Sequence, residues 1–135
     1  MSPHRPKPAH VLILFSDTGG GHRSAAEAII EAIKTDFPGQ ITTEMVDIFK
    51  DYAPYPLDLA PSIYPPLSHL PDVWGLGYHL SDGQRRTRLV TNLMWPYVRR
   101  SLRQLIRERP CDLIVSVHPL ANMPVLRALG VNRPP

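Results

Sequence analysis

Three consecutive glycines, Gly19 to Gly21, constrain the fold of this chain more than any other feature, because of what flanks them. Residues 10–15 before them are apolar on both faces, which is typical of a buried parallel strand. Residues 24–35 after them carry alanine and isoleucine at helical spacing. A buried strand, a glycine turn and a helix therefore begin the chain, and residues 41–48 have the length and β-branched content of a second strand.

The C-terminal part repeats this alternation. Residues 111–117 indicate a third buried strand, the chain turns at His118 and Pro119, and residues 122–129 indicate a short helix. A chain of 135 residues has the length of one domain. We therefore expect an α/β fold with a Rossmann-like parallel sheet, a flexible tail over 1–8 and one domain over 9–135. The alternation breaks off where the next strand is due, so we expect the domain to be incomplete.

A long insertion, residues 49–83, follows the second predicted strand. Its prolines predict no long helix and little regular structure, since proline lacks a backbone N–H: they are residues 54, 56, 61, 65, 66 and 71. The same segment contains Trp74, Tyr78 and many aliphatic side chains, too many for a plain linker. Irregular connections of this length usually bind something or form a lid.

Positive charge is concentrated in a predicted helix over 85–109. Its apolar residues, from Leu89 to Ile106, are predicted to form one stripe, and Pro96 is predicted to kink or restart the helix. The segment has a single acidic residue, Glu108, against eight arginines: residues 85, 86, 88, 99, 100, 103, 107 and 109. Arg99, Arg103 and Arg107 recur every four residues and share a helix face.

Two interpretations of this basic helix and of the aromatic residues in the preceding insertion remain open. In the first, aromatics enter the headgroup region of a membrane and arginines hold anionic lipids; this interpretation assigns Trp74, Tyr78, Arg85, Arg86, Arg99, Arg103 and Arg107 to the membrane surface. In the second, the arginines are a solvated face and the aromatics pack beneath the insertion. The sequence shows no nucleic-acid-binding motif, so we expect no nucleic-acid partner.

The apolar run 11–15 is too short for a signal peptide or a membrane span, so we expect neither. The chain has a single cysteine, Cys111, which excludes an internal disulfide and indicates a reducing compartment and an inert core thiol. We expect a peripheral membrane protein on the cytoplasmic side.

The glycine turn is suited to a negatively charged ligand, because glycine admits positive φ and the following helix offers unpaired N–H groups. His22 stands at that helix N-terminus, where the dipole disfavours the cationic ring, so a neutral imidazole is available to accept a proton from a hydroxyl. Asp17 is placed to orient the ring or to cap the turn. The alternative is that His22 is a polar first-turn residue that bonds the loop.

His118 follows the third strand at its carboxyl end, where ligands bind in open parallel sheets. It either faces the same crevice as His22 or is a turn histidine before Pro119. No histidine shows metal-ligand spacing, and we expect no metal. Gly19-x-Gly21 with Ser24 only partly matches a dinucleotide fingerprint, and Asp47 stands where its ribose acid would be. A nucleotide-binding oxidoreductase fragment is therefore one alternative.

The segment Phe15-Ser-Asp-Thr-Gly-Gly-Gly-His-Arg-Ser-Ala-Ala-Glu-Ala-Ile29, with Cys111-Asp-Leu-Ile-Val-Ser-Val-His-Pro119, resembles the N-terminal domain of monogalactosyldiacylglycerol synthases. These are relatives of the processive diacylglycerol glucosyltransferases. The resemblance implies the N-terminal half of a GT-B fold and transfer of a hexose, with inversion, from a UDP-sugar to diacylglycerol. It implies that His22 is the general base and that Gly19, Gly20 and Gly21 lie near the donor sugar and phosphates.

The family's donor domain, which binds most of the UDP-sugar, is absent from these residues. The resemblance therefore implies that the chain acts with this missing half, supplied in cis or in trans, and is inactive or nearly so without it. It implies no cofactor beyond the UDP-sugar as co-substrate. A non-catalytic module that binds a lipid surface is the other alternative.

Overall fold

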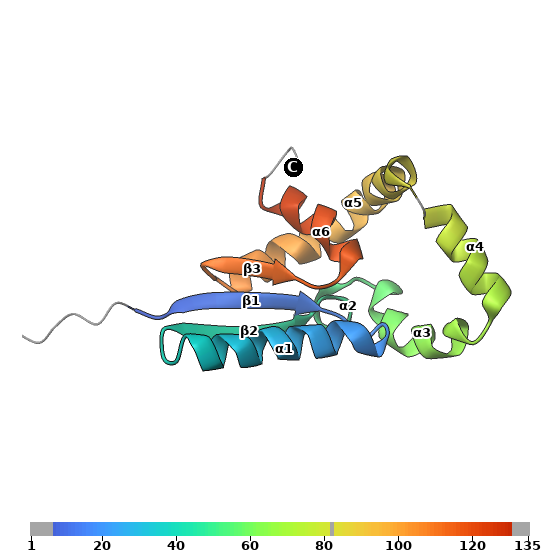
Figure 1. Ribbon diagram of the computed structural model, residues 1–135. Coiled ribbons are helices and arrows are strands. Elements are labelled where there is room, and N and C mark those ends of the chain that lie inside the picture. Colours follow the sequence, from blue (N-terminus) through green and yellow to red (C-terminus); the bar gives the residue numbers. More distant parts are fainter. Residues whose placement is uncertain (1–6, 82, 131–135) are drawn as a thin grey trace, which may run out of the picture.

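The computed structural model describes residues 7–81 and 83–130, which form a parallel sheet with helices on both faces (Figure 1). The sheet has the order β2-β1-β3, with β1 at Ala9–Phe15, β2 at Ile41–Asp47 and β3 at Leu113–Ser116. The register pairs Ala9 with Ile41 and Val11 with Leu113. Because all three strands are parallel, their carboxyl ends meet at one edge of the sheet.

The predicted α/β fold is confirmed, but the third strand is shorter and less buried than expected. Leu113 is 56% exposed and the rest of β3 is only partly buried. Within the described chain β3 is an edge strand that pairs with β1 alone. An edge strand covers less of its surface than the central one, and this explains why residues of the same apolar type are fully buried in β1.

Alternate side chains of β1 enter two separate cores, as the period of a strand requires. Val11, Ile13 and Phe15 pack against Ala26 of α1, which spans Gly20–Asp36. On the other face, Leu12 and Leu14 pack against residues of α5 (Gln84–Glu108) and α6 (Pro119–Ala128). Figure 1 shows α1 on one side of the sheet and α5 and α6 on the other. Helices on both faces explain the uninterrupted apolar run of β1.

A short helix, α2 (Ile48–Tyr52), directly follows β2 and is capped by Asp47. One carboxylate oxygen of Asp47 accepts hydrogen bonds from the backbone N–H groups of Phe49 and Lys50, at 3.0 Å each. The other oxygen accepts from the N–H of Asp17 at 3.1 Å. The residue that the dinucleotide interpretation assigned to a ribose is thus a buried structural cap.

The insertion is largely helical, so the expectation of little regular structure is wrong. It contains a 3₁₀ turn, η1 (Leu57–Leu59), and the helices α3 (Ala60–Ser68) and α4 (Pro71–Ser81). Pro71 opens α4 and Pro61 lies in the first turn of α3, where an N–H has no intrahelical partner to lose. The longest of these helices has 11 residues, which agrees with the prediction of no long helix. In α5, the helix continues through Pro96 without a fresh start.

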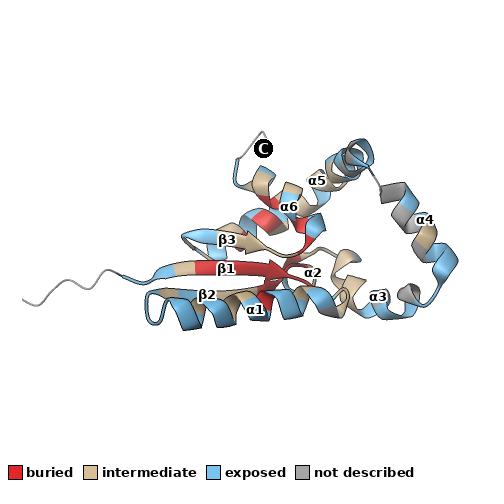
Figure 2. Ribbon diagram, in the orientation of Figure 1, coloured by how far each residue is buried: buried red, intermediate tan, exposed pale blue. Residues whose placement is uncertain are grey.

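Residues 57–97, here called the helical arm, add no buried side chain to either core, and of the arm's described residues only the partly buried Trp95 packs against one of them. None of the described side chains between Tyr52 and Leu102 is buried, and Figure 2 shows the arm as exposed or intermediate. Several of its aliphatic and aromatic side chains are clearly exposed: Leu59, Ile63, Leu70, Val73, Leu76, Leu89, Val90, Leu93 and Tyr97. The arm is therefore an apolar surface without a protein cover in the described chain.

The apolar residues of α5 do not form one stripe, contrary to prediction. Leu102 and Leu105 are buried against the sheet, whereas Leu89 and Leu93 are 59% and 70% exposed. At about 100° per residue, Leu89 and Leu93 lie on the same side of the helix as Arg100 and Arg107, opposite Leu105. The two apolar groups thus face opposite directions.

Among the helices of residues 7–81 and 83–130, none has the combined length and apolarity of a bilayer-spanning segment. Cys111 is partly buried, and burial, assisted by the charge of Asp112, raises the pKa of its thiol. A raised pKa keeps the sulfur protonated and poorly nucleophilic.

Candidate functional site

His22 lies in the first turn of α1, at the edge of the sheet where the parallel strands end. Its Nδ1 is 2.8 Å from the carbonyl oxygen of Val117, the residue that follows β3. A carbonyl oxygen only accepts hydrogen bonds, so Nδ1 carries the hydrogen and donates it. In the neutral ring, Nε2 then holds a lone pair. The ring is half-buried rather than enclosed in the core, so an incoming molecule can reach it.

His118 packs directly against this ring. It is the N-cap residue of α6, and its ring centroid lies 4.5 Å from that of His22. The side chain is buried, and its Nε2 shares a 2.8 Å hydrogen bond with the hydroxyl of Thr18. Burial, with a smaller effect of His22, lowers the pKa of His118 to about 4. His118 is therefore neutral at pH 7 and adds no charge beside His22.

Two buried polar atoms at this site lower the stability of the fold. Nδ1 of His118 and the hydroxyl of Ser16 are buried without a hydrogen-bond partner among the described residues. A buried polar atom without a partner costs about 1–3 kcal/mol. Such atoms are uncommon in folded proteins, and they often mark functional sites.

The glycine turn contributes backbone rather than side chains. Gly19, the N-cap of α1, has φ 96° and ψ 140°, a conformation that residues with a Cβ avoid. Gly21 has no such requirement, and a Cβ built there would meet no heavy atom within 4 Å. No described side chain caps α1, whose first residue is Gly20, so its N–H groups remain available to an anion.

Asp17 binds Arg23 rather than the histidines in the described contacts. The guanidinium donates to both carboxylate oxygens, at 2.8 and 2.6 Å, and lies over the ring of Phe15. The hydrogen bond from Arg23 lowers the pKa of Asp17. The ring of His22 takes its orientation from Val117, so an orienting role for Asp17 has no contact to support it here.

Three groups of this site were not expected from the sequence. The carbonyl of Val117 is a main-chain atom, so no residue type could have indicated it. Phe49, whose ring meets that of His118 edge-on at 5.3 Å between centroids, looked like any apolar residue of the insertion. Thr18 did carry a signal, because a hydroxyl within a glycine turn is a common ligand-facing group.

The predicted membrane residues are only partly described. Arg85, Arg86, Arg99, Arg103 and Arg107 are all exposed on α5. The guanidinium of Arg86 also donates to the backbone carbonyl of His79. Trp74 and Tyr78 belong to α4, but their side chains lie outside the described residues.

No group of three metal-binding side chains occurs in residues 7–81 and 83–130. Asp47 is engaged in backbone hydrogen bonds. Two other groups therefore stand at this edge of the sheet: the partly buried imidazole of His22 and the N-terminus of α1, which has no side-chain cap.

Comparison with known proteins identifies the family. The family described as Monogalactosyldiacylglycerol (MGDG) synthase matches residues 22–134. The chain belongs to the MGDG synthase family. The match begins at His22 and includes β3 and His118.

Named MGDG synthases are similar along most of this chain. It is 32% identical to MGDG synthase 1, chloroplastic, of Arabidopsis thaliana over 123 residues, which are 91% of this chain and 23% of that protein. It is 33% identical to the MGDG synthase, chloroplastic, of Spinacia oleracea over 131 residues, 96% of this chain and 24% of that protein. The chain therefore spans about a quarter of the length of these relatives. No solved structure matches it.

Proposed function

We propose that this chain is the acceptor- and membrane-binding part of a glycolipid glycosyltransferase that transfers a hexose from a UDP-sugar to diacylglycerol with inversion. The observation that carries the proposal is the hydrogen bond from Nδ1 of His22 to the carbonyl of Val117. It leaves Nε2 as a proton acceptor on a partly buried ring, in a chain that belongs to the MGDG synthase family.

In the proposed reaction His22 is the general base. Its Nε2 takes the proton of the acceptor hydroxyl as the hydroxyl oxygen bonds to the anomeric carbon from the face opposite the UDP. The bond between the anomeric carbon and the β-phosphate oxygen breaks, and UDP leaves with the bonding electron pair. One displacement inverts the anomeric configuration. Buried, neutral His118 packs beside the base without adding a competing positive charge.

The glycine turn suits the donor side of this step. Negative charge develops on the diphosphate as it leaves, and in the proposed reaction the N–H groups at Gly20 and Gly21, at a helix N-terminus without a side-chain cap, stabilise that charge. Gly21 has open space where a side chain would stand, so protein packing does not explain the absence of one. Most donor contacts are assigned to a second domain of a GT-B enzyme, in cis or in trans, and the chain alone is expected to be inactive or nearly so.

The helical arm supplies the proposed membrane surface. On α5, Leu89, Leu93 and Tyr97 are exposed and lie between arginines at both ends of the same helix face. Apolar side chains flanked by cations suit the interface of an anionic bilayer, with the apolar part in the acyl boundary. The proposed location is peripheral, on the cytoplasmic side.

Reconstitution tests the catalytic part of the proposal. The chain is combined with the donor-binding remainder of an MGDG synthase, a UDP-hexose and vesicles that contain diacylglycerol, and glycolipid formation is measured. His22→Ala should lower the rate by about 10²–10⁴-fold, the usual effect of losing a general base. A His22→Ala rate within a few-fold of the unchanged chain would refute the base assignment.

A second candidate function is a lipid-surface module without sugar chemistry. The exposed apolar side chains of the arm favour it, since they explain membrane binding without requiring a base. Vesicle flotation without turnover, whatever donor half is added, would support this alternative. Turnover that depends on His22 would eliminate it.

A further inference from the structure

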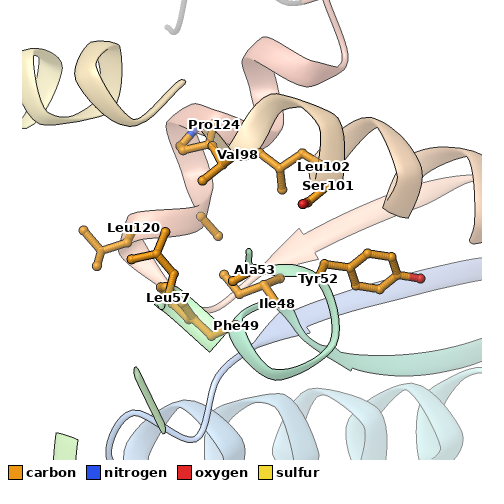
Figure 3. A pocket seen from close by; sticks show the side chains of 11 residues that line it. Ile48, Phe49, Tyr52, Ala53, Leu57, Val98, Ser101, Leu102, Leu120 and Pro124 are labelled. Atoms are coloured by element: carbon orange, nitrogen blue, oxygen red, sulfur yellow. The ribbon is translucent and has the colours of Figure 1, made fainter. Parts of the chain in front are cut away.

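A pocket lies on the α5 and α6 face of the sheet (Figure 3). Counted out into open solvent it has a volume of about 410 Å³, and it is lined by residues of α2, η1, α5 and α6, with Ala53 from the connection between α2 and η1. The part of it that admits the centre of a water-sized molecule measures about 70 Å³. The function proposed above does not yet assign it a role.

The lining is almost entirely apolar. Ile48, Phe49, Val98, Leu102, Leu120 and Pro124 provide most of the wall. Tyr52 also contributes, but its hydroxyl donates to Glu108 and accepts from Arg109, and Figure 3 shows it directed away from the other labelled side chains. Ser101 is the remaining polar side chain of the wall. A charged or sugar-like ligand would lose its hydration here without compensation.

Two ring contacts connect the pocket to the proposed base. Phe49 lines the pocket and meets the ring of His118 at 5.3 Å, and His118 meets His22 at 4.5 Å. The pocket also includes Ala121, whose N–H donates to the carbonyl of His118 at 3.0 Å. Leu120, which is 58% exposed, brings the wall to the protein surface. The buried ring of His118 thus lies between His22 and Phe49 of the pocket wall, so the pocket is separated from the proposed base by one side chain.

We propose that this pocket holds one fatty acyl chain of the acceptor. The inference rests on the proposed function, because it takes the acceptor to be a diacylglycerol. An acyl chain is apolar, like the wall of the pocket. Its ester link to glycerol places the free hydroxyl a few bonds from the chain. The pocket thereby positions the hydroxyl at His22, while the helical arm holds the membrane from which the lipid comes.

Photolabelling with the 135-residue chain tests this inference. The probe is a diacylglycerol with a diazirine on one acyl chain, carried in phosphatidylcholine vesicles, and the labelled peptides are mapped. We expect adducts within 48–57, 98–102 and 120–124, displaced by excess dioctanoylglycerol. Ser101→Phe, which fills the pocket, should lower this labelling by about tenfold, equivalent to about 1.4 kcal/mol. Gln104→Phe, which adds the same ring on the exposed side of α5, should keep it within about twofold.

A second pocket-filling variant, Ala53→Leu, keeps the test valid if Ser101→Phe does not fold. Thermal unfolding verifies that each variant folds. Adducts confined to 85–97, no labelling at all, or labelling unchanged in both folded pocket variants would overturn the inference. These results are separable from failure of the proposed function. Labelled pocket peptides without His22-dependent turnover would support the acyl-chain site and refute the proposed reaction. Turnover that depends on His22 without pocket labelling would support the reaction and refute the acyl-chain site.

Discussion

The imidazole of His22 donates from Nδ1 to the carbonyl oxygen of Val117 across 2.8 Å, so a main-chain atom determines which ring nitrogen carries the proton. Side chains that orient a catalytic histidine are usually carboxylates. Here the nearest candidate, Asp17, is bound by Arg23 in a two-point ion pair. The backbone itself thus determines which ring nitrogen is left to accept a proton.

Replacing His22 by asparagine should separate this anchoring role from the proposed chemistry. The Asn amide nitrogen stands close to the place of Nδ1 and can still donate to Val117, but nothing replaces Nε2. His22→Ala should lower the free energy of unfolding by about 1 kcal/mol, the usual net value of one hydrogen bond, and His22→Asn by less. Urea unfolding measures this, and both variants should lose turnover in the reconstituted enzyme. Turnover by His22→Asn near that of the original would contradict the role of Nε2.

The glycines of the turn should respond differently to alanine. Gly19→Ala should destabilise the fold by about 1–3 kcal/mol, because φ 96° is unfavourable for a residue with a Cβ. Gly21→Ala should leave stability unchanged or raise it, since the site has open space and alanine is the better helix residue by up to about 1 kcal/mol. If the turn contacts the donor, Gly21→Ala should nevertheless raise the KM for UDP-hexose. Unfolding curves and donor kinetics together test both positions, and equal stability of the two variants would be the contrary result.

His118 should make folding sensitive to acid. Its pKa is about 4 in the folded chain against an ordinary 6.5, so the unfolded chain binds the proton first as the pH falls. The stability of the fold is therefore complete above pH 6.5 and decreases as the pH falls from 6.5 to 4, by up to about 3 kcal/mol. His118→Gln should lose less stability than the original chain over this interval, measured by urea unfolding at a series of pH values. The exposed His69→Gln serves as the control, and parallel pH profiles of His118→Gln and the original would be evidence against a buried neutral ring.

Single changes on α5 should weaken vesicle binding. Arg103→Gln removes a cation worth about 1 kcal/mol near an anionic surface, which is roughly fivefold in the partition coefficient. The weaker vesicle binding of Arg103→Gln should disappear at high salt, because salt screens charges. The weaker binding of Leu93→Ser should persist, because Leu93 contributes an apolar contact. Lys34→Gln is the matched control, since it removes the same charge from α1 on the opposite side of the sheet. Equal flotation of Arg103→Gln and Lys34→Gln would show that vesicle binding depends on the net charge of the chain and not on the position of the arginine.

The sequence was informative wherever local pattern and tertiary position agree. The apolar run of β1 and the following glycines predicted the strand, the turn and the helix because a buried central strand and positive φ leave few alternatives. His22 and His118 could be expected at one edge because parallel strands end together. Their ring contact and the bond to Val117 could not, since these depend on how far each loop turns.

The number of prolines in the insertion is a poor guide to its structure, for a physical reason. A proline count takes no account of position, yet proline is tolerated in the first turn of a helix, where Pro61 and Pro71 lie. Similarly, an apolar residue at helical spacing does not indicate which face will be covered. Leu93 and Leu102 belong to the same helix and have opposite environments.

The lack of any buried side chain between Tyr52 and Leu102 in the described chain has a consequence for amide hydrogen exchange. Opening the helical arm breaks helical hydrogen bonds but exposes little core, so its free energy is local and lies well below that of global unfolding. Amides of α3 and α4 should exchange early, while those of β1 exchange last. The part proposed to meet a bilayer can thus change shape with curvature and lipid packing without disturbing the two imidazoles at the sheet.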